Sequence, residues 1–132
     1  MVLLELNGTL SCRSVVEAKS LEDVLLYLDY WQPDVVVVEE FRLYPWTAKS
    51  LGWDSMRPSQ IIGAIKAWVS RCGHEVELVE QPASVRKPAQ AHTRKMEKSP
   101  MFRGKPHARD ALRHAVWYTL HRCPKKVMEA GW

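Results

Sequence analysis

Three side chains combine residue types and spacing that could hold a divalent metal ion. His107 and Asp110 are three residues apart, so in a helix both would project from one face. Glu39 follows a run of valines, where a strand would place a carboxylate at its carboxyl end. Oxygen ligands with one nitrogen suit Mg²⁺ or Mn²⁺ better than Zn²⁺. In two-metal phosphodiester cleavage, such carboxylates hold ions about 3.5–4 Å apart that activate water and stabilise the leaving oxygen.

Simpler interpretations of these residues stay open. Asp110 can merely stabilise the N-terminus of its helix, with His107 an ordinary surface residue. His114, four residues after Asp110, adjoins the same helix face. Two cysteines and two histidines also invite a zinc site, in the pairs Cys72/His74 and His121/Cys123. Zinc ligands usually have two to four residues between them, whereas these pairs have one, so the sequence argues against zinc.

A basic segment between residues 85 and 105 is the clearest charge feature of the chain. It contains seven basic residues and one acid, so it carries +6 while the rest of the chain carries −2. The basic residues are Arg86, Lys87, Arg94, Lys95, Lys98, Arg103 and Lys105. A local basic block beside an acidic body indicates a polyanionic partner, although a solvated lysine-rich loop has the same composition. Because the segment also lacks apolar periodicity, we expect a mobile loop that contacts a polyanion.

Turn signals and β-branched residues predict the strands. Residues 2–18 follow the order strand, Asn-Gly, strand, which favours a hairpin with a type I′ turn. Residues 34–41 contain four consecutive valines, which indicates a strand covered on both faces. A further strand is expected to begin near Glu75 and to end at Gln81. Alternating strands and helices in the second half predict an α/β fold, with helices packed on a mixed sheet.

Three helices complete the predicted order β-β-α-β-α-β-α. The first begins at Ser20, whose side chain can cap its first turn, and stops before Pro33. The second covers residues 59–72, with Gly73 as its C-cap. The third covers residues 106–122, because proline suits a first helical position and apolar residues recur at helical spacing.

Length and composition describe one globular domain over residues 1–132. With 46% hydrophobic and 26% charged residues, the chain can bury a core. Residues 42–58 are expected to form an aromatic and basic loop, and residues 125–132 a peripheral tail. No membrane span or signal peptide is evident, and nothing indicates a small-molecule cofactor. Three widely spaced cysteines are typical of reduced thiols, so a cytoplasmic protein is expected.

Three segments, read in order, resemble the RuvC-type Holliday junction resolvases, most closely those of phages. Residues 33–41 are similar to a family strand that ends in a catalytic Glu. Residues 59–65, followed by residues 77–87, resemble a helix, the next strand and a basic segment in which Lys87 lies near the substrate. Residues 107–115 resemble the last helix with its metal-binding pair, in the variant that has His before Asp.

The resemblance implies an RNase H-like fold and a metal-dependent endonuclease that cuts branched or four-way junction DNA, usually as a homodimer. Glu39 matches the catalytic Glu, Asp110 the terminal Asp and His107 its upstream partner. These three residues would therefore be catalytic and would hold Mg²⁺, with Mn²⁺ as a substitute. Glu40 follows the catalytic Glu in the sequence and would support the metal ligands without binding the metal. The basic segment 85–105 would bind the phosphates of the DNA. A phage-encoded enzyme of this kind would act in the cytoplasm of its bacterial host.

One departure from the family concerns its first strand, which ends in a catalytic Asp, usually within Asp-Pro-Gly. This chain has no such segment, so the resemblance implies an N-terminally truncated domain with an impaired active site. Glu5 is the alternative carboxylate, although only 15 residues separate it from Ser20. A non-catalytic DNA-binding or assembly module derived from the same fold is the second interpretation. A nuclease acting on RNA in a hybrid would use the same metal chemistry.

Overall fold

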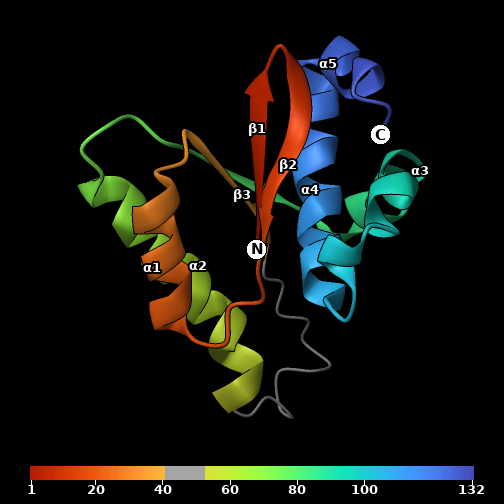
Figure 1. The fold of residues 1–132 in the computed structure, drawn as a ribbon. Coiled ribbons are helices and arrows are strands. Elements are labelled where there is room, and N and C mark those ends of the chain that lie inside the picture. The colour runs from red at the N-terminus through yellow and green to blue at the C-terminus, as the bar shows by residue number, and fades with distance from the viewer. Residues whose placement is uncertain (41–52) are drawn as a thin grey trace. The chain divides into compact units, whose positions relative to one another are not determined.

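The computed structural model describes residues 1–40 and 53–132, with the backbone alone for residues 53–58. The chain is a mixed α/β protein. The sequence predicts one domain, whereas the contacts divide the chain into two compact units (Figure 1). The terminal unit comprises Met1–Ala18 and Gln81–Trp132, and the central unit comprises Lys19–Glu80.

The terminal unit opens with the expected antiparallel hairpin of β1 (Val2–Asn7) and β2 (Thr9–Val15). Gly8 connects the strands with a φ of 76°. A type I′ turn requires positive φ at both central residues. The φ of Asn7 is not positive, so the predicted turn type is wrong.

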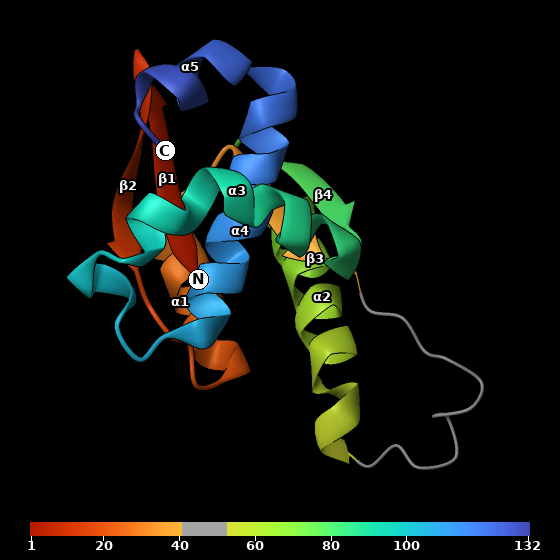
Figure 2. The ribbon, with the colours of Figure 1, turned by 90° about the vertical axis from the view of Figure 1, so that its right-hand side faces the viewer.

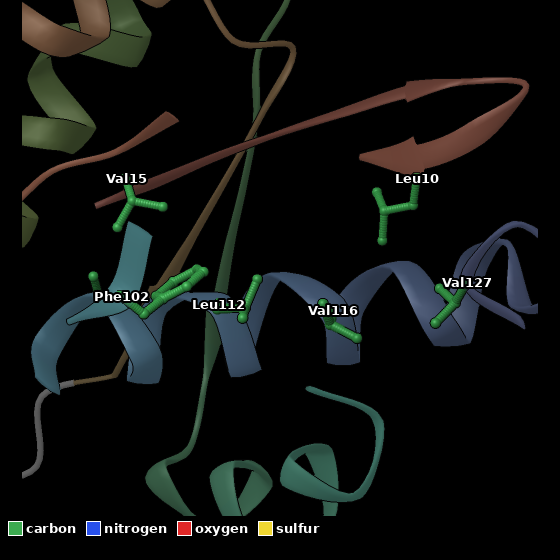
Figure 3. Packing of buried hydrophobic residues seen from close by; sticks show 7 residues of the cluster. Leu10, Val15, Phe102, Leu112, Val116 and Val127 are labelled. Atoms are coloured by element: carbon green, nitrogen blue, oxygen red, sulfur yellow. The ribbon is translucent and has the colours of Figure 1, made fainter. Parts of the chain in front are cut away.

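Helix α4 (Pro106–Arg122) begins and ends as predicted, and it organises the terminal unit. The hairpin packs on one side of α4 and α3 (Arg86–Glu97) on another (Figures 1 and 3). The backbone N–H of Ala108 donates to the Glu17 carboxylate at 3.0 Å. Glu17 thus satisfies one of the amides that a helix start leaves without a partner, and its charge suits the helix dipole.

The core of the terminal unit lies between α4, β2 and α5 (Pro124–Glu129), as Figure 3 shows. Leu112 and Val116 of α4 are completely buried, and Leu10 of β2 is 4% exposed. Fully burying an aliphatic side chain contributes about 1.5–3 kcal/mol. The apolar residues that recur at helical spacing in residues 106–122 therefore include the side chains that α4 buries in the core, as expected.

The peripheral tail predicted for residues 125–132 is wrong. Val127 is 1% exposed and belongs to the core, and the Trp132 indole N–H donates to the Leu10 carbonyl at 3.0 Å. Helix α5 has Pro124 in its first turn and packs against β2. One buried valine among lysines gives no periodic signal, which explains the failure.

The basic segment is mainly helical, which corrects the predicted loop over residues 85–105. A 3-10 turn, η2 (Ala83–Val85), leads into α3, and a second, η3 (Pro100–Phe102), follows it. Helix α3 packs against α4 (Figure 2). Its completely buried residues are Ala89 and Thr93, one helical turn apart. Alanine and threonine are not large apolar residues, so they do not form the apolar stripe by which an amphipathic helix is predicted. The sequence pattern therefore did not predict this helix.

The central unit begins with α1 (Leu21–Trp31), whose start is as predicted. The Ser20 hydroxyl accepts a hydrogen bond from the Asp23 N–H at 3.1 Å. Helix α1 packs against α2 (Trp53–Arg71), and the Trp68 indole N–H donates to Asp29 at 2.6 Å.

Helix α2 differs from its prediction at both ends. It begins at Trp53 rather than Ser59, so residues 53–58 of the expected loop are helical, and residues 42–52 lie outside the described part of the chain. Gly73 does not have the positive φ of the predicted C-cap. The Cys72 N–H instead donates to the Val69 carbonyl at 3.3 Å, a tighter closing turn.

Strands β3 (Val35–Glu39) and β4 (Glu77–Gln81) form a second two-stranded sheet. The Glu77 N–H donates to the Asp34 carbonyl at 2.9 Å, so both strands start side by side, as in a parallel β-α-β unit. The β3 valines are partly exposed, so the expected cover on both faces is wrong.

The predicted single mixed sheet is also wrong for the described strands, which form two separate pairs. Paired strands must lie about 4.8 Å apart to share hydrogen bonds. Among the described residues, no further strand joins the hairpin to the pair of β3 and β4.

Candidate nucleic-acid interface

The first turns of α4 bring His107 and Asp110 to neighbouring positions, as predicted. His107 is exposed, and the Asp110 side chain is 30% exposed. Each Asp110 oxygen accepts from an arginine: Oδ2 lies 3.2 Å from Arg86 Nη1, and Oδ1 lies 3.0 Å from Arg113 Nη1. Asp110 therefore joins α4 to the start of α3 through its ion pair with Arg86, whereas its ion pair with Arg113 lies within α4.

This arrangement within the terminal unit does not fit the Mg²⁺ site that the resemblance implies. His107 and Asp110 supply one negative charge between them, and both Asp110 oxygens already face guanidinium groups. Mg²⁺ needs near-octahedral oxygen ligands at about 2.0–2.1 Å. Within the described ranges, no three His, Cys, Asp or Glu residues form a group that could hold a metal ion.

Glu39 and Glu40 lie in the central unit. Glu39 is the last residue of β3, the position expected from the sequence, and both side chains are partly buried. The predicted approach of Glu39 to His107 and Asp110 therefore involves the other unit and stays a prediction. Glu5 lies on β1 and forms an exposed ion pair with Arg13 at 2.9 Å, so it has a local role in the hairpin.

His114 does not share the exposed surface of His107. It is 3% exposed, and the Gln81 side-chain amide donates to its carbonyl oxygen at 3.0 Å. The same amide nitrogen lies 3.0 Å from His114 Nδ1. His114 is therefore a hydrogen-bonded core residue.

The zinc alternative receives no support from the described residues. Cys72 Sγ lies 3.7 Å from His74 Nδ1 in the central unit. The second pair, His121 and Cys123, belongs to the terminal unit, and His121 Nδ1 lies 2.8 Å from the Trp117 carbonyl oxygen.

A largely buried ion pair joins the end of α3 to α4. Arg113 binds the Glu97 carboxylate with two nitrogens, Nη2 at 2.6 Å and Nε at 3.1 Å, and the Thr93 hydroxyl donates to the same carboxylate. The Glu97 side chain is 9% exposed and that of Arg113 is 19% exposed. Two parallel hydrogen bonds between Arg and a carboxylate give a strong and directional contact.

Both pKa values follow from this contact. Burial raises the pKa of Glu97, but the hydrogen bonds from Arg113 and Thr93 outweigh it, so the pKa lies below its ordinary value of 4.5. The hydrogen bonds to Glu97 raise the pKa of Arg113, although burial opposes them. Glu97 and Arg113 are thus a fixed, mutually neutralised pair.

A cavity of about 570 Å³ lies beside this pair, within the terminal unit. Its lining residues come from α3, η3 with its flanking residues, and α4: Gln90, Arg94, Glu97, Lys98, Ser99, Arg103, Arg109 and Arg113. Five of them are cationic and one is anionic, a formal excess of four positive charges. Such a concentration of positive charge suits a polyanionic ligand.

The seven residues that were predicted to bind DNA fall into three groups: residues that line the cavity, residues exposed elsewhere on α3, and residues with contacts inside the terminal unit. Arg94, Lys98 and Arg103 line the cavity. Lys87 and Lys95 are exposed on α3 and do not line it.

The two other residues of the predicted set have contacts inside the terminal unit. Arg86 pairs with Asp110, and Lys105 Nζ lies 3.5 Å from the Val15 carbonyl.

Sequence reasoning missed Arg109, Arg113 and Glu97. Arg109 and Arg113 are four residues apart on the predicted last helix, so their shared face was visible in the sequence. Glu97, the only acid in the basic segment, was a second signal for an internal ion pair. The basic segment was predicted from its charge alone. Nothing in that charge pattern indicated that the arginines of the next helix would lie beside it.

No model of a known protein family and no curated protein matches this chain. In the part of the chain that the structure describes, no helix has the length and apolar character needed to cross a membrane.

Proposed function

We propose that this chain binds branched DNA through the cationic surface formed by α3, η3 and the start of α4. The observation that carries the proposal is the cavity with five cationic side chains and one carboxylate. The resemblance to RuvC-type junction resolvases gives the class of DNA, and with it an RNase H-like fold and a homodimer. The order β3, α2, β4 and α4 is compatible with that resemblance.

The charge distribution supports DNA as the polyanion. The segment 85–105 carries +6 and the rest of the chain −2, so attraction to phosphates is local. Contacts to phosphates position a protein on DNA without reading its sequence. Binding through this surface would therefore select the shape of the DNA, tolerate changes of base sequence and weaken strongly with salt.

The test is the binding of a fluorescent four-way junction by the full chain over a range of salt concentrations. A variant with Arg94, Lys98 and Arg103 changed to Gln should bind more weakly, and its salt slope should flatten by about 0.9 for each phosphate that the protein no longer neutralises. The matched control changes three exposed cations of the central unit, Lys19, Lys66 and Arg71, to Gln. Equal weakening in the two triple variants would contradict the proposal, because only net charge would matter.

A metal-dependent endonuclease is the second candidate. Its support is that Glu39 ends β3 while His107 and Asp110 lie at the start of α4, the positions that the resemblance requires. Activity would need Glu39 to join Asp110, and it would need Asp110 to lose an arginine partner. Glu5, which pairs with Arg13, is the carboxylate that would have to replace the absent aspartate of the first strand.

Cleavage of the junction in Mg²⁺ and in Mn²⁺ tests this candidate. Asp110→Asn and Glu39→Gln should abolish cutting without abolishing junction binding, and Glu5→Gln should do so only if Glu5 replaces the absent aspartate. Binding without cutting by the unaltered chain would support the DNA-binding module instead.

A further inference from the structure

We propose that the cavity between α3 and α4 is a discrete site for a compact phosphate group that carries more negative charge than a backbone phosphodiester. A terminal phosphate on a DNA strand and a free diphosphate share this chemistry. The inference rests on the proposed DNA binding and refines it. The cavity would bind the phosphate at a strand end in preference to a backbone phosphate, whereas the exposed lysines of α3 would contact the backbone alone.

The cavity has a fixed wall and several available cations. The three side-chain nitrogens of Arg113 contact Glu97 or Asp110, so this residue is held in place. The other four cationic side chains form no hydrogen bond or ion pair with any described residue: Arg94, Lys98, Arg103 and Arg109. Four like charges around one cavity repel each other, and a bound anion would relieve that repulsion.

Arg109 gives a second, independent indication of a ligand. Its Nε is buried and has no hydrogen-bond partner within the described chain. A buried donor without an acceptor is costly, so such donors are nearly always paired in folded proteins. A phosphate oxygen in the cavity would supply the missing acceptor, and arginine binds phosphate with two parallel N–H groups.

The spacing of the cations favours a compact anion. Arg94 and Lys98 are one turn apart at the end of α3, and Arg109 and Arg113 are one turn apart on α4, so two helices supply pairs of cations to one cavity. The hollow of about 570 Å³ is open to solvent and larger than one phosphate group, so the DNA attached to a bound phosphate can extend out of it. A backbone phosphodiester carries one charge, whereas a phosphate monoester carries about −1.5 to −2 at pH 7.

Two measurements on the full chain test the inference. The first is calorimetric titration with inorganic pyrophosphate. The second compares otherwise identical DNA duplexes that end in a 5′-phosphate or a 5′-hydroxyl. We expect pyrophosphate to bind and the 5′-phosphate duplex to bind more tightly than its 5′-hydroxyl counterpart.

Variants locate the effect. Arg94→Gln and Arg109→Gln should each weaken pyrophosphate binding about tenfold, as expected when one charge-assisted hydrogen bond is removed, and should abolish the 5′-phosphate preference. Lys87→Gln and Lys95→Gln remove the same charge from α3 outside the cavity. They should weaken the binding of both duplexes alike, and leave pyrophosphate binding and the preference for the 5′-phosphate unchanged. Arg109→Lys keeps the charge and the fold but removes the Nε donor, so it should also weaken binding.

The outcomes separate this inference from the proposed function. Junction binding without pyrophosphate binding or a 5′-phosphate preference would overturn the inference and leave the DNA proposal standing. Pyrophosphate binding that depends on Arg109, without binding to any DNA, would uphold the phosphate site and overturn the DNA proposal. Equal effects of the cavity variants and the two lysine controls would overturn the inference, because binding would then follow net charge.

Discussion

Replacing Arg113 with Met should show how much the ion pair with Glu97 contributes to the stability of the packing between α3 and α4. The change leaves the Glu97 carboxylate, 9% exposed, without the two hydrogen bonds of 2.6 and 3.1 Å that now compensate its burial. It also removes one of the two arginines that bind Asp110, although Arg86 remains. The charge on Glu97 would then be stabilised chiefly by the Thr93 hydroxyl.

The expected destabilisation follows from the burial of the pair. Removing one partner of a buried ion pair costs roughly 3–5 kcal/mol. Because Arg113 is 19% exposed and the Thr93 hydrogen bond persists, we expect the lower end of that range, about 3 kcal/mol of unfolding free energy. Glu97→Gln should cost less, about 1–2 kcal/mol, because its amide oxygen still accepts from Arg113. Changing both residues to Met should cost under about 1 kcal/mol, because neither charge is then left buried.

The assay is urea unfolding combined with native-state hydrogen exchange in α3 and α4, which reports on the terminal unit separately. The control is Arg13→Met, which removes an exposed pair with Glu5, where the side chains are 62% and 45% exposed, and should cost less than about 1 kcal/mol. An effect of Arg113→Met no larger than that of this control would refute the assigned role of the ion pair. A double variant as unstable as Arg113→Met would refute it as well.

Two further predictions concern acid and the C-terminal tail. Because the folded state lowers the pKa of Glu97 below 4.5, its stabilising contribution should be complete above that pH and lost as the pH falls through the folded pKa. The stability difference between the wild type and Glu97→Gln, measured by urea unfolding, should therefore shrink between pH 7 and about pH 3, and a constant difference would contradict the assigned shift. Val127→Ala should cost about 2 kcal/mol by the same assay, because two buried methyl groups are removed and a cavity remains. Met128→Ala, at a side chain 68% exposed, should change stability by no more than about 0.5 kcal/mol, and equal effects would show that the tail is not part of the core.

Elements with local signals could be predicted from the amino-acid sequence. Pro106 and the apolar spacing after it predicted both ends of α4, and Ser20 predicted the start of α1. The Asn-Gly pair predicted the hairpin, although the φ of Asn7 showed that the turn type was wrong. These predictions succeeded because each depends on hydrogen bonds and side-chain spacing within a few residues.

Features that depend on distant residues were determined by tertiary packing. Helix α3 buries Ala89 and Thr93, and Val127 enters the core; neither small side chains nor one valine among lysines give a periodic pattern. The number and pairing of strands in each sheet likewise depend on segments far apart in the chain.

The same distinction applies to the candidate site. The basic segment and the residues of the first turns of α4 could be predicted, because local charge and helical spacing can be read directly from the sequence. Glu97 and Arg113 are 16 residues apart on different helices, and their ion pair exists only because α3 packs against α4. That packing brings the basic segment to the arginines of α4 and creates the cavity, since no single helix could concentrate these charges around one ligand.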